Sequence, residues 1–259
     1  NLIFKRNLIT NYGGLNEWER PKYNQFQKWL LKINIDVATR FSNFNVVDNY
    51  ELKKSIESTF NCSSLIIRYG GDHFKKNYNH DKSLINKYPF VKGKYYLSVA
   101  RAQVDTNLHL LINTFKDGFD FPLVIISNWS VSEYGRNLKN KFNNNPNLIL
   151  LDAIYDSVEI NFIRKNCYLY IHSHSYCGTA PSLVEAICLE LPIVCYNVPT
   201  NRETTLNKSK YFSDEKSLTM ILNDLDQNKI QNLKLELNTL IDRNYTWEKI
   251  SNDYKKLLI

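Results

Sequence analysis

Short apolar runs alternate with helix-spaced apolar stripes along almost the whole chain. The runs have the length of buried strands, and the stripes repeat every three to four residues, as helices packed on a sheet do. We expect strands over residues 8–10, 45–47, 64–68, 95–100, 123–127, 148–151, 169–172 and 193–196. We expect helices over residues 19–41, 50–60, 107–115, 133–142, 158–165 and 182–190, and a helical tail from residue 214. This alternation predicts an α/β fold built on a doubly wound, mostly parallel sheet.

A polar, irregular stretch over residues 72–94 separates two series of elements. The second series is long enough for a complete doubly wound domain, whereas the first is too short to be one. We therefore predict two units, residues 1–71 and residues 72–259. The chain starts at Asn1 without an initiator Met, and we expect it to be a fragment of a longer protein.

Composition narrows the class of protein. A hydrophobic fraction of 43% with 13% aromatic residues is enough for a buried core and argues against disorder. The formal net charge of +7 favours acidic partners such as nucleotide diphosphates, nucleic acid or an anionic membrane surface. A solubilising charge spread over the surface accounts for it equally well. Lys and Arg form no block, so we expect no nucleic-acid partner.

The five cysteines are odd in number and contain no C-x-x-C pair, which indicates neither a disulfide framework nor a zinc site. We find no signal-peptide pattern and no apolar run that approaches the roughly 18 residues of a membrane span. We expect a cytoplasmic protein that is soluble or attached peripherally to a membrane.

Ligands of doubly wound sheets bind at the carboxyl ends of the strands, and three loops there carry candidate chemistry. The first loop runs from Arg101 to Asn107, between a strand and a helix. An Arg at this place can contact a phosphate through two parallel hydrogen bonds, although taken alone it is more often a surface residue. The third loop runs from Asp152 to Tyr155, where the backbone and the aromatic ring could hold a nucleobase or simply pack.

The second loop runs from His172 to Glu185. Pro181 is a favoured first-turn residue, so a helix begins just behind Gly178 and Thr179. The free N–H groups at this helix start make an anion site. Glu185 lies one turn inside the helix, where its carboxylate can accept hydrogen bonds from ribose hydroxyls or simply be an exposed helix residue.

Missing motifs argue against two classes of enzyme. No G-x-G-x-x-G follows a strand, as nicotinamide and flavin dehydrogenases require, and no G-x-x-x-x-G-K-[ST] occurs, as P-loop NTPases require. His172 and His174 alternate at one strand end without a third ligand at useful spacing, so we expect no metal.

The segment from His172 to Glu203, HSHSYCGTAPSLVEAICLELPIVCYNVPTNRE, resembles the donor-site signature of family-four retaining glycosyltransferases, which have the GT-B fold. More narrowly, it is similar to a subgroup that includes bacterial capsule and O-antigen rhamnosyltransferases. That subgroup has a His-x-His-Ser…Gly-Thr-x-Pro-Ser-Leu-x-Glu-Ala motif. Further matches are Asn128-Trp129, Tyr134-Gly135, Ile154-Tyr155-Asp156, Arg164, the interdomain strand at 67–70, and the segment 14–20, which resembles Gly-Leu-Glu-Trp-x-Arg with one residue inserted.

The resemblance covers nearly the whole chain and implies roles for its residues. Residues 1–71 would be the C-terminal remnant of an acceptor-side domain, and residues 72–259 the Rossmann-like donor-binding domain. As catalytic residues, Arg101 would contact the donor diphosphate and Glu185 would hold the ribose. The other expected donor-binding residues, of which 178–182 would cradle the diphosphate through backbone N–H groups, are Asn107, Asn128, Ile154, Tyr155, His174, Ser175, Gly178, Thr179, Ala180, Pro181 and Ser182.

The implied reaction is a retaining transfer of rhamnose from dTDP-rhamnose, for a cell-surface polysaccharide. The acceptor would be a saccharide or a polyprenyl-linked saccharide at the inner face of a bacterial membrane, and neither a metal nor another cofactor would be needed. The rest of the acceptor domain would precede Asn1, and its loss can leave the fragment inactive.

The sequence also departs from the family pattern. The common family has a Lys five or six residues after its Arg, where Thr106 and Asn107 stand, and the first Glu of its Glu-x7-Glu motif is Cys177 here. The subgroup lacks the Lys too and usually has Gly at the latter site. Two alternatives stay open: a nucleotide-sugar 2-epimerase of the same fold, for which these loops offer no spare acidic pair, and a degenerate, non-catalytic nucleotide-sugar-binding module.

Overall fold

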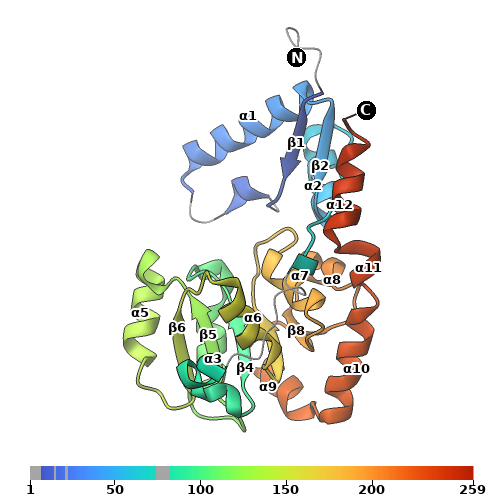
Figure 1. Cartoon of the computed structure of the whole chain (residues 1–259). Coiled ribbons are helices and arrows are strands. Elements are labelled where there is room, and N and C mark those ends of the chain that lie inside the picture. The colour runs from blue at the N-terminus through green and yellow to red at the C-terminus, as the bar shows by residue number, and fades with distance from the viewer. Residues whose placement is uncertain (1–6, 15, 21–22, 74–81, 259) are drawn as a thin grey trace.

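The structure, a computed structural model, describes residues 7–14, 16–20, 23–73 and 82–258. It consists of a larger unit with six strands and a smaller unit with three, stacked on one another in Figure 1. All the strand pairs are parallel, so the predicted α/β fold is confirmed. Within the described residues, no helix has both the length and the apolar character needed to cross a bilayer.

The larger unit is built on a sheet with the strand order β6-β5-β4-β7-β8-β9. Its strands are β4 (Tyr96–Val99), β5 (Leu123–Ser127), β6 (Leu148–Asp152), β7 (Leu169–His172), β8 (Ile193–Tyr196) and β9 (Lys210–Phe212). The order reverses between β4 and β7, which pair although β5 and β6 lie between them in the sequence. The carboxyl edge at such a reversal is where doubly wound sheets bind ligands.

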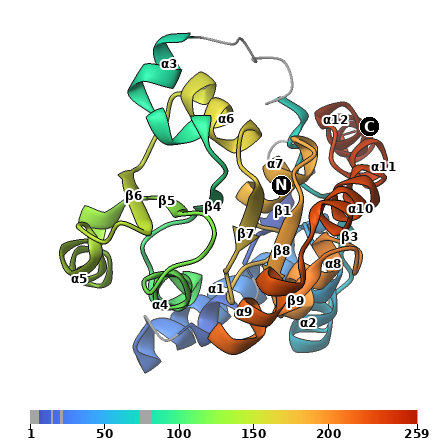
Figure 2. The ribbon, with the colours of Figure 1, turned by 90° about the horizontal axis from the view of Figure 1, so that it is seen from below.

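Helices cover both faces of this sheet (Figure 2). One face carries α3 (Lys82–Lys87), α6 (Ser157–Lys165) and α7 (Pro181–Cys188), and the other carries α4 (Leu108–Phe115), α5 (Glu133–Phe142) and α9 (Glu215–Asp224). Every residue of β5 is buried, because a sheet covered on both sides has no solvent face. The remaining helices of this part are α8 (Pro199–Thr204), α10 (Gln227–Asn238) and α11 (Ile241–Asn244).

The smaller unit is a sheet of order β1-β2-β3, formed by β1 (Ile9–Tyr12), β2 (Phe44–Val47) and β3 (Leu65–Ile66). On one face, α1 (Gln25–Phe41) and α2 (Tyr50–Phe60) pack on the strands. On the other face, Ile250 of α12 (Trp247–Lys255) packs with Val46 and Ile67. Figure 1 shows α10, α11 and α12 climbing back from the larger unit to the smaller one. The division into residues 1–71 and 72–259 stays a prediction. In the structure, α12 belongs to the second of these ranges but packs on the sheet of the smaller unit.

Several predicted element bounds are wrong, for local reasons. Helix α1 begins at Gln25 and not at residue 19, because Asn24 and Gln27 form a reciprocal capping box. Arg20 before it has extended backbone angles (φ −58°, ψ 136°), as a residue that precedes proline should. The stretch 72–94, predicted as irregular, contains α3 and a 3-10 turn at Pro89–Lys92, and its residues 74–81 lie outside the described part. Helix α8 and strand β9 were also not predicted, since both are too short to show a periodic pattern.

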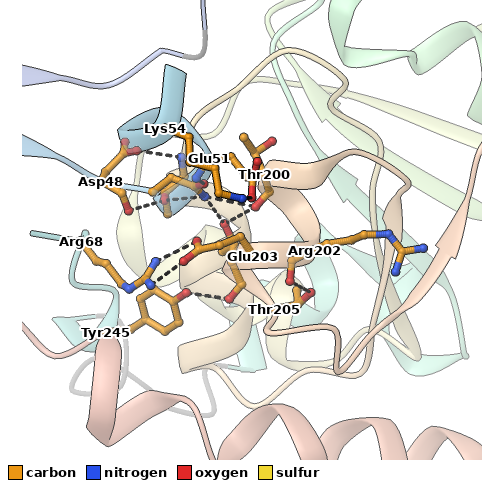
Figure 3. A network of polar contacts seen from close by, with 12 residues as sticks. Asp48, Glu51, Lys54, Arg68, Thr200, Arg202, Glu203, Thr205 and Tyr245 are labelled. Carbon is orange, nitrogen blue, oxygen red and sulfur yellow. Dashed lines mark hydrogen bonds and ion pairs between the residues drawn. The ribbon is translucent and has the colours of Figure 1, made fainter. Parts of the chain in front are cut away.

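A buried polar network joins the two units (Figure 3). Asn49, at the start of α2, donates from its side-chain amide to the Thr200 carbonyl at 3.2 Å and to the Thr204 hydroxyl at 3.3 Å, both on α8. Arg68, just beyond β3, forms a two-pronged ion pair with Glu203 of the same helix, and one of its two bonds measures 2.9 Å. Because these groups are largely excluded from water and bond to one another across the two units, they fix α8 against the smaller unit.

Asp48 makes the second tie between the units. Its carboxylate accepts the Thr179 N–H at 3.2 Å, and its backbone carbonyl accepts the Thr179 hydroxyl at 2.8 Å. Burial raises the pKa of Asp48 from its ordinary value of 3.8 to about 6, against the opposing effect of the Thr179 hydrogen bond. At neutral pH the Asp48 carboxylate is therefore charged in surroundings that favour its protonated, neutral form.

The Asp48→Asn variant should become more stable relative to wild type as the pH rises from about 4 to 7. Between the unfolded and the folded pKa, the folded protein keeps a proton that the unfolded chain has lost, so the contribution of Asp48 to stability falls across this window. The shift of the pKa to about 6 corresponds to a change of roughly 2–3 kcal/mol. Thermal melts of both proteins at a series of pH values measure it, with Asp36→Asn on α1 as the surface control. A difference that stays constant with pH would contradict the assignment.

Candidate functional site

A cavity of about 650 Å³ lies at the carboxyl edge of the larger sheet and opens toward the smaller unit. Of the predicted site residues, those that line it are Arg101, Asn128, Ile154, Tyr155, His174, Gly178, Thr179, Ala180, Pro181, Ser182 and Glu185. The smaller unit contributes Gly13 and Arg20. All three predicted loops therefore meet at one place, as the parallel topology requires.

Asn107 and Ser175, also predicted as donor-binding residues, do not line this cavity. The Asn107 side chain donates to the Ser173 carbonyl at 3.0 Å, while its backbone caps α4 in the left-handed region (φ 53°). Ser175 donates from both its N–H and its hydroxyl to the Asp105 carbonyl, each at 2.9 Å. Both residues thus hold the first and second loops together.

Arg101 follows β4 and is the exposed cation of the cavity. Its backbone carbonyl accepts bonds from the Gln103 N–H and the Thr106 hydroxyl, at 2.9 and 2.8 Å. The loop is therefore tightly turned, and Thr106 is a buried turn residue. Among the residues that the structure describes, none forms an ion pair with the Arg101 guanidinium, which leaves its planar set of donors for a ligand.

The loop before α7 supplies fewer backbone donors than its length suggests. The Thr179 N–H is donated to Asp48, and Pro181 at the first helical position has no N–H. Gly178 lies so close to the smaller unit that a Cβ on it would be 2.8 Å from the Asp48 carboxylate. The amides of Gly178, Ala180 and Ser182 remain as the donors that can point at an anion at this helix start.

Glu185 has a partner that the sequence did not reveal. Its Oε2 lies 2.6 Å from Nη2 of Arg164 on α6, in an ion pair whose side chains are 18% and 4% exposed. Such a buried arginine fixes the position of the carboxylate. A carboxylate accepts at both oxygens, so Glu185 can still receive hydrogen bonds from the cavity.

The third loop and Asn128, which follows the neighbouring strand β5, line the cavity with both apolar and polar side chains. Tyr155 is 90% exposed, while Ile154 packs against the core of the larger unit. Asn128, after β5, accepts the Ala102 N–H on its side-chain oxygen at 2.9 Å and so braces the Arg101 loop.

His172, His174 and Cys177, all in the first half of the second loop, form a compact cluster. Each offers one ligand atom, and these atoms lie within 4.8 Å of one another. The prediction that the two histidines lack a third ligand at useful spacing is therefore wrong, because the loop folds Cys177 back onto them. Two imidazoles and a thiolate are a donor set that Zn²⁺ or copper accepts.

The buried thiol and the nearby arginines oppose a cation in this cluster, whereas neutral imidazoles are the form that binds metals. Burial keeps the pKa of His172 well below 6.5 and, together with Arg101 and Arg20, lowers the pKa of His174 to about 4. Burial also raises the pKa of the Cys177 thiol to about 12. All three side chains are neutral at physiological pH, and the two arginines make the place beside His174 more suited to an anion.

Arg20 is the main residue that sequence reasoning missed. It is 7% exposed, lines the cavity, and donates to the Tyr176 carbonyl at 3.2 Å across the two units. The segment 14–20 carried a signal for it, since its resemblance to the subgroup ends on this arginine. Leu15 of that segment lies outside the described residues.

The family model of the Glycosyl transferases group 1 matches residues 81–239, which is more than half of the chain. The chain belongs to this family. It is a glycosyltransferase, and the matched region carries all three loops of the cavity. A comparison with curated proteins gives no match.

Solved structures of glycosyltransferases share the fold of this one at low sequence identity. HepE from Anabaena, in complex with UDP-glucose, superposes with a TM-score of 0.78 at 13% identity, over 98% of this chain and 72% of HepE. The α,α-trehalose 6-phosphate synthase from Burkholderia multivorans gives a TM-score of 0.80 at 11% identity, over 98% and 66%. The sucrose-phosphate synthase from Thermosynechococcus elongatus gives 0.77 at 13%, over 96% and 66%. At these identities the likeness concerns the fold, which is GT-B.

Proposed function

We propose that this glycosyltransferase moves rhamnose from dTDP-rhamnose, with retention of configuration, onto a saccharide or polyprenyl-linked saccharide precursor of a cell-surface polysaccharide. The observation that supports it is the convergence of Arg101, the start of α7 and Glu185 on one cavity. An arginine and free helix amides suit a diphosphate, and a carboxylate beyond them suits a ribose.

In the proposed reaction the bond between the sugar and the diphosphate breaks, and the diphosphate takes the electron pair. An acceptor hydroxyl forms the new bond to the same sugar carbon and gives its proton to the departing diphosphate. Arg101 and the amides of Gly178, Ala180 and Ser182 would stabilise this developing negative charge. Glu185, held by Arg164, would fix the ribose, and the base would lie along Ile154 and Tyr155. The chain's own residues thus supply electrostatic stabilisation and positioning.

The carboxylates of the cavity favour transfer over 2-epimerisation. An epimerase needs acidic groups that abstract protons near the sugar. The acidic residues that line the cavity are Asp105 and Glu185, and each faces an arginine, Arg20 at 3.6 Å and Arg164 at 2.6 Å. Product analysis with radiolabelled donor and full-length protein separates transferase, epimerase and non-catalytic binding module.

Arg101→Ala should weaken the binding of nucleoside diphosphates about ten- to a hundred-fold, the equivalent of roughly 1.5–3 kcal/mol for hydrogen bonds to a charged group. Nucleoside binding should change little, because the base and the ribose lie elsewhere in the cavity. Calorimetry with dTDP, UDP and their nucleosides measures both effects. The matched control is Arg136→Ala, on the surface of α5. Equal losses for nucleoside and diphosphate would refute a phosphate role for Arg101.

Wild type should bind dTDP at least as tightly as UDP. One oxygen of Glu185 pairs with Arg164, which leaves the other to accept from the sugar of the nucleotide. A deoxyribose has only its 3′-hydroxyl to donate to this oxygen, whereas a ribose has two hydroxyls. Glu185→Gln should therefore reduce dTDP binding less than UDP binding, and calorimetry on both proteins with both nucleotides measures this. HepE has been crystallised with UDP and with UDP-glucose, so UDP is the natural rival. A clear wild-type preference for UDP would refute the dTDP donor while leaving the transferase in place.

We also propose that the protein contacts the membrane surface peripherally through α1. Its outward stripe of Phe26, Trp29 and Val37 is 65%, 57% and 48% exposed, and the two rings stack. Lys28 and Lys32 stand between these apolar positions, an arrangement typical of helices that lie on anionic membranes.

The double substitution Phe26→Ser/Trp29→Ser should lower binding to phosphatidylserine-containing vesicles about tenfold, since it removes two aromatic anchors. Vesicle flotation measures the bound fraction. Leu235→Ser, at a 55% exposed position on α10, is the matched control and should leave flotation unchanged. Equal flotation of the double variant and wild type would exclude this surface of α1.

A further inference from the structure

Two arginines, one from each unit, line the donor cavity. Arg101 comes from the larger unit and Arg20 from the smaller one. Among the cavity-lining residues that the structure describes, these are the permanently charged cations. The Arg20 guanidinium is held in place: its Nε lies 2.8 Å from Glu17 Oε2, and its Nη2 donates to the Tyr176 carbonyl at 3.2 Å.

Arg20 borders both the loop that carries Arg101 and the second loop. Its Nη1 lies 3.6 Å from the carboxylate of Asp105, in the Arg101 loop, and its Nη2 donates to the carbonyl of Tyr176, in the second loop, at 3.2 Å. The two cations therefore flank one stretch of the cavity, beside the amides that begin α7. A diphosphate carries more than one negative charge, and one exposed arginine with a helix start balances only part of it.

In the first loop, the common family has a lysine where Thr106 and Asn107 stand here, and Thr106 serves the turn instead. Thr106 is buried, and its hydroxyl donates to the Arg101 and Gln103 carbonyls at 2.8 and 2.7 Å. Thr106 lines the cavity but carries no charge, and its hydroxyl is used by the turn. Among the described residues that line the cavity, Arg20 is the cation that accompanies Arg101.

We propose that Arg20 is a second diphosphate-binding residue, so that one arginine from each unit holds the nucleoside diphosphate between them. Asp105 lies 3.6 Å from Arg20 Nη1, too far for a good hydrogen bond, and it is the group that an incoming phosphate would displace. This inference rests on the proposed nucleotide-sugar donor.

Calorimetry on Arg20 variants tests the inference, with UDP and dTDP as probes and uridine and thymidine as the phosphate-free references. Arg20→Gln should weaken diphosphate binding about five- to thirty-fold and leave nucleoside binding unchanged, as expected for a lost charged hydrogen bond. Arg20→Lys should recover part of the loss, because it keeps the charge but not the two-pronged geometry. Arg40→Gln, which removes an arginine paired with Asp36 on α1, is the matched control and should bind as wild type does.

A gain-of-affinity variant separates ligand binding from a merely structural role. Asp105→Asn removes the carboxylate that competes for Arg20 and should tighten diphosphate binding about two- to five-fold. In the Arg20→Gln background the same change should have no effect. Melting temperatures show whether each variant is folded, and Arg20→Lys with Asp105→Asn keeps the test intact if Arg20→Gln is not.

The possible results lead to different conclusions. A folded Arg20→Gln protein whose diphosphate affinity lies within twofold of wild type overturns the inference, and so do equal losses for diphosphate and nucleoside. If Arg101→Ala behaves as expected in either case, the proposed function stands without Arg20. If wild type binds neither UDP nor dTDP, the proposed function fails and the inference fails with it.

Discussion

The contact of Asp48 with Thr179 is the constraint on which the arrangement of the site depends. It joins the end of β2 in the smaller unit to the loop that begins α7 in the larger one. A buried carboxylate needs hydrogen bonds inside the protein, and one oxygen of Asp48 accepts the Thr179 N–H of that loop. Gly178 allows the approach, since any side chain there would meet the Asp48 oxygen. The same contact therefore shapes the anion site and sets where the smaller unit lies.

Its neighbours make this tie rigid. Asn49 forms hydrogen bonds with α8, and Arg68 forms an ion pair with the same helix. Where the chain crosses between the units, the Gly71 N–H donates to the Tyr245 carbonyl at 2.9 Å. The second crossing, through α11, brings α12 onto the far face of the smaller sheet. The smaller unit is thus anchored at several points, which is why Gly13 and Arg20 can belong to a cavity otherwise made by the larger unit.

Charge within the cavity is arranged by burial as much as by residue type. Arg164 is nearly inaccessible and is committed to Glu185, whereas Arg101 is exposed and is paired with none of the described residues. The side chains of His172, His174 and Cys177 can each carry a charge, but burial keeps all three neutral. The result is a cavity with positive charge where the diphosphate is proposed to bind and a fixed carboxylate where the ribose is proposed to bind.

The sequence by itself determined the fold class and most of the elements, because strands and helices of an α/β fold differ in apolar period over short distances. Strand β5, helix α2 and helix α5 lie at the predicted residues, and the loop signature led to the residues that line the cavity. Bounds that depend on a cap, such as the start of α1, were missed because Asn24 competes with other polar residues nearby. Only the tertiary structure decided the contacts of Arg164 with Glu185, of Asp48 with Thr179, and of Arg20 with the cavity, although segment 14–20 had singled out Arg20 by its resemblance to the subgroup. The two pairs are 21 and 131 residues apart in the chain, so their contact is a consequence of topology and packing, which no local pattern encodes.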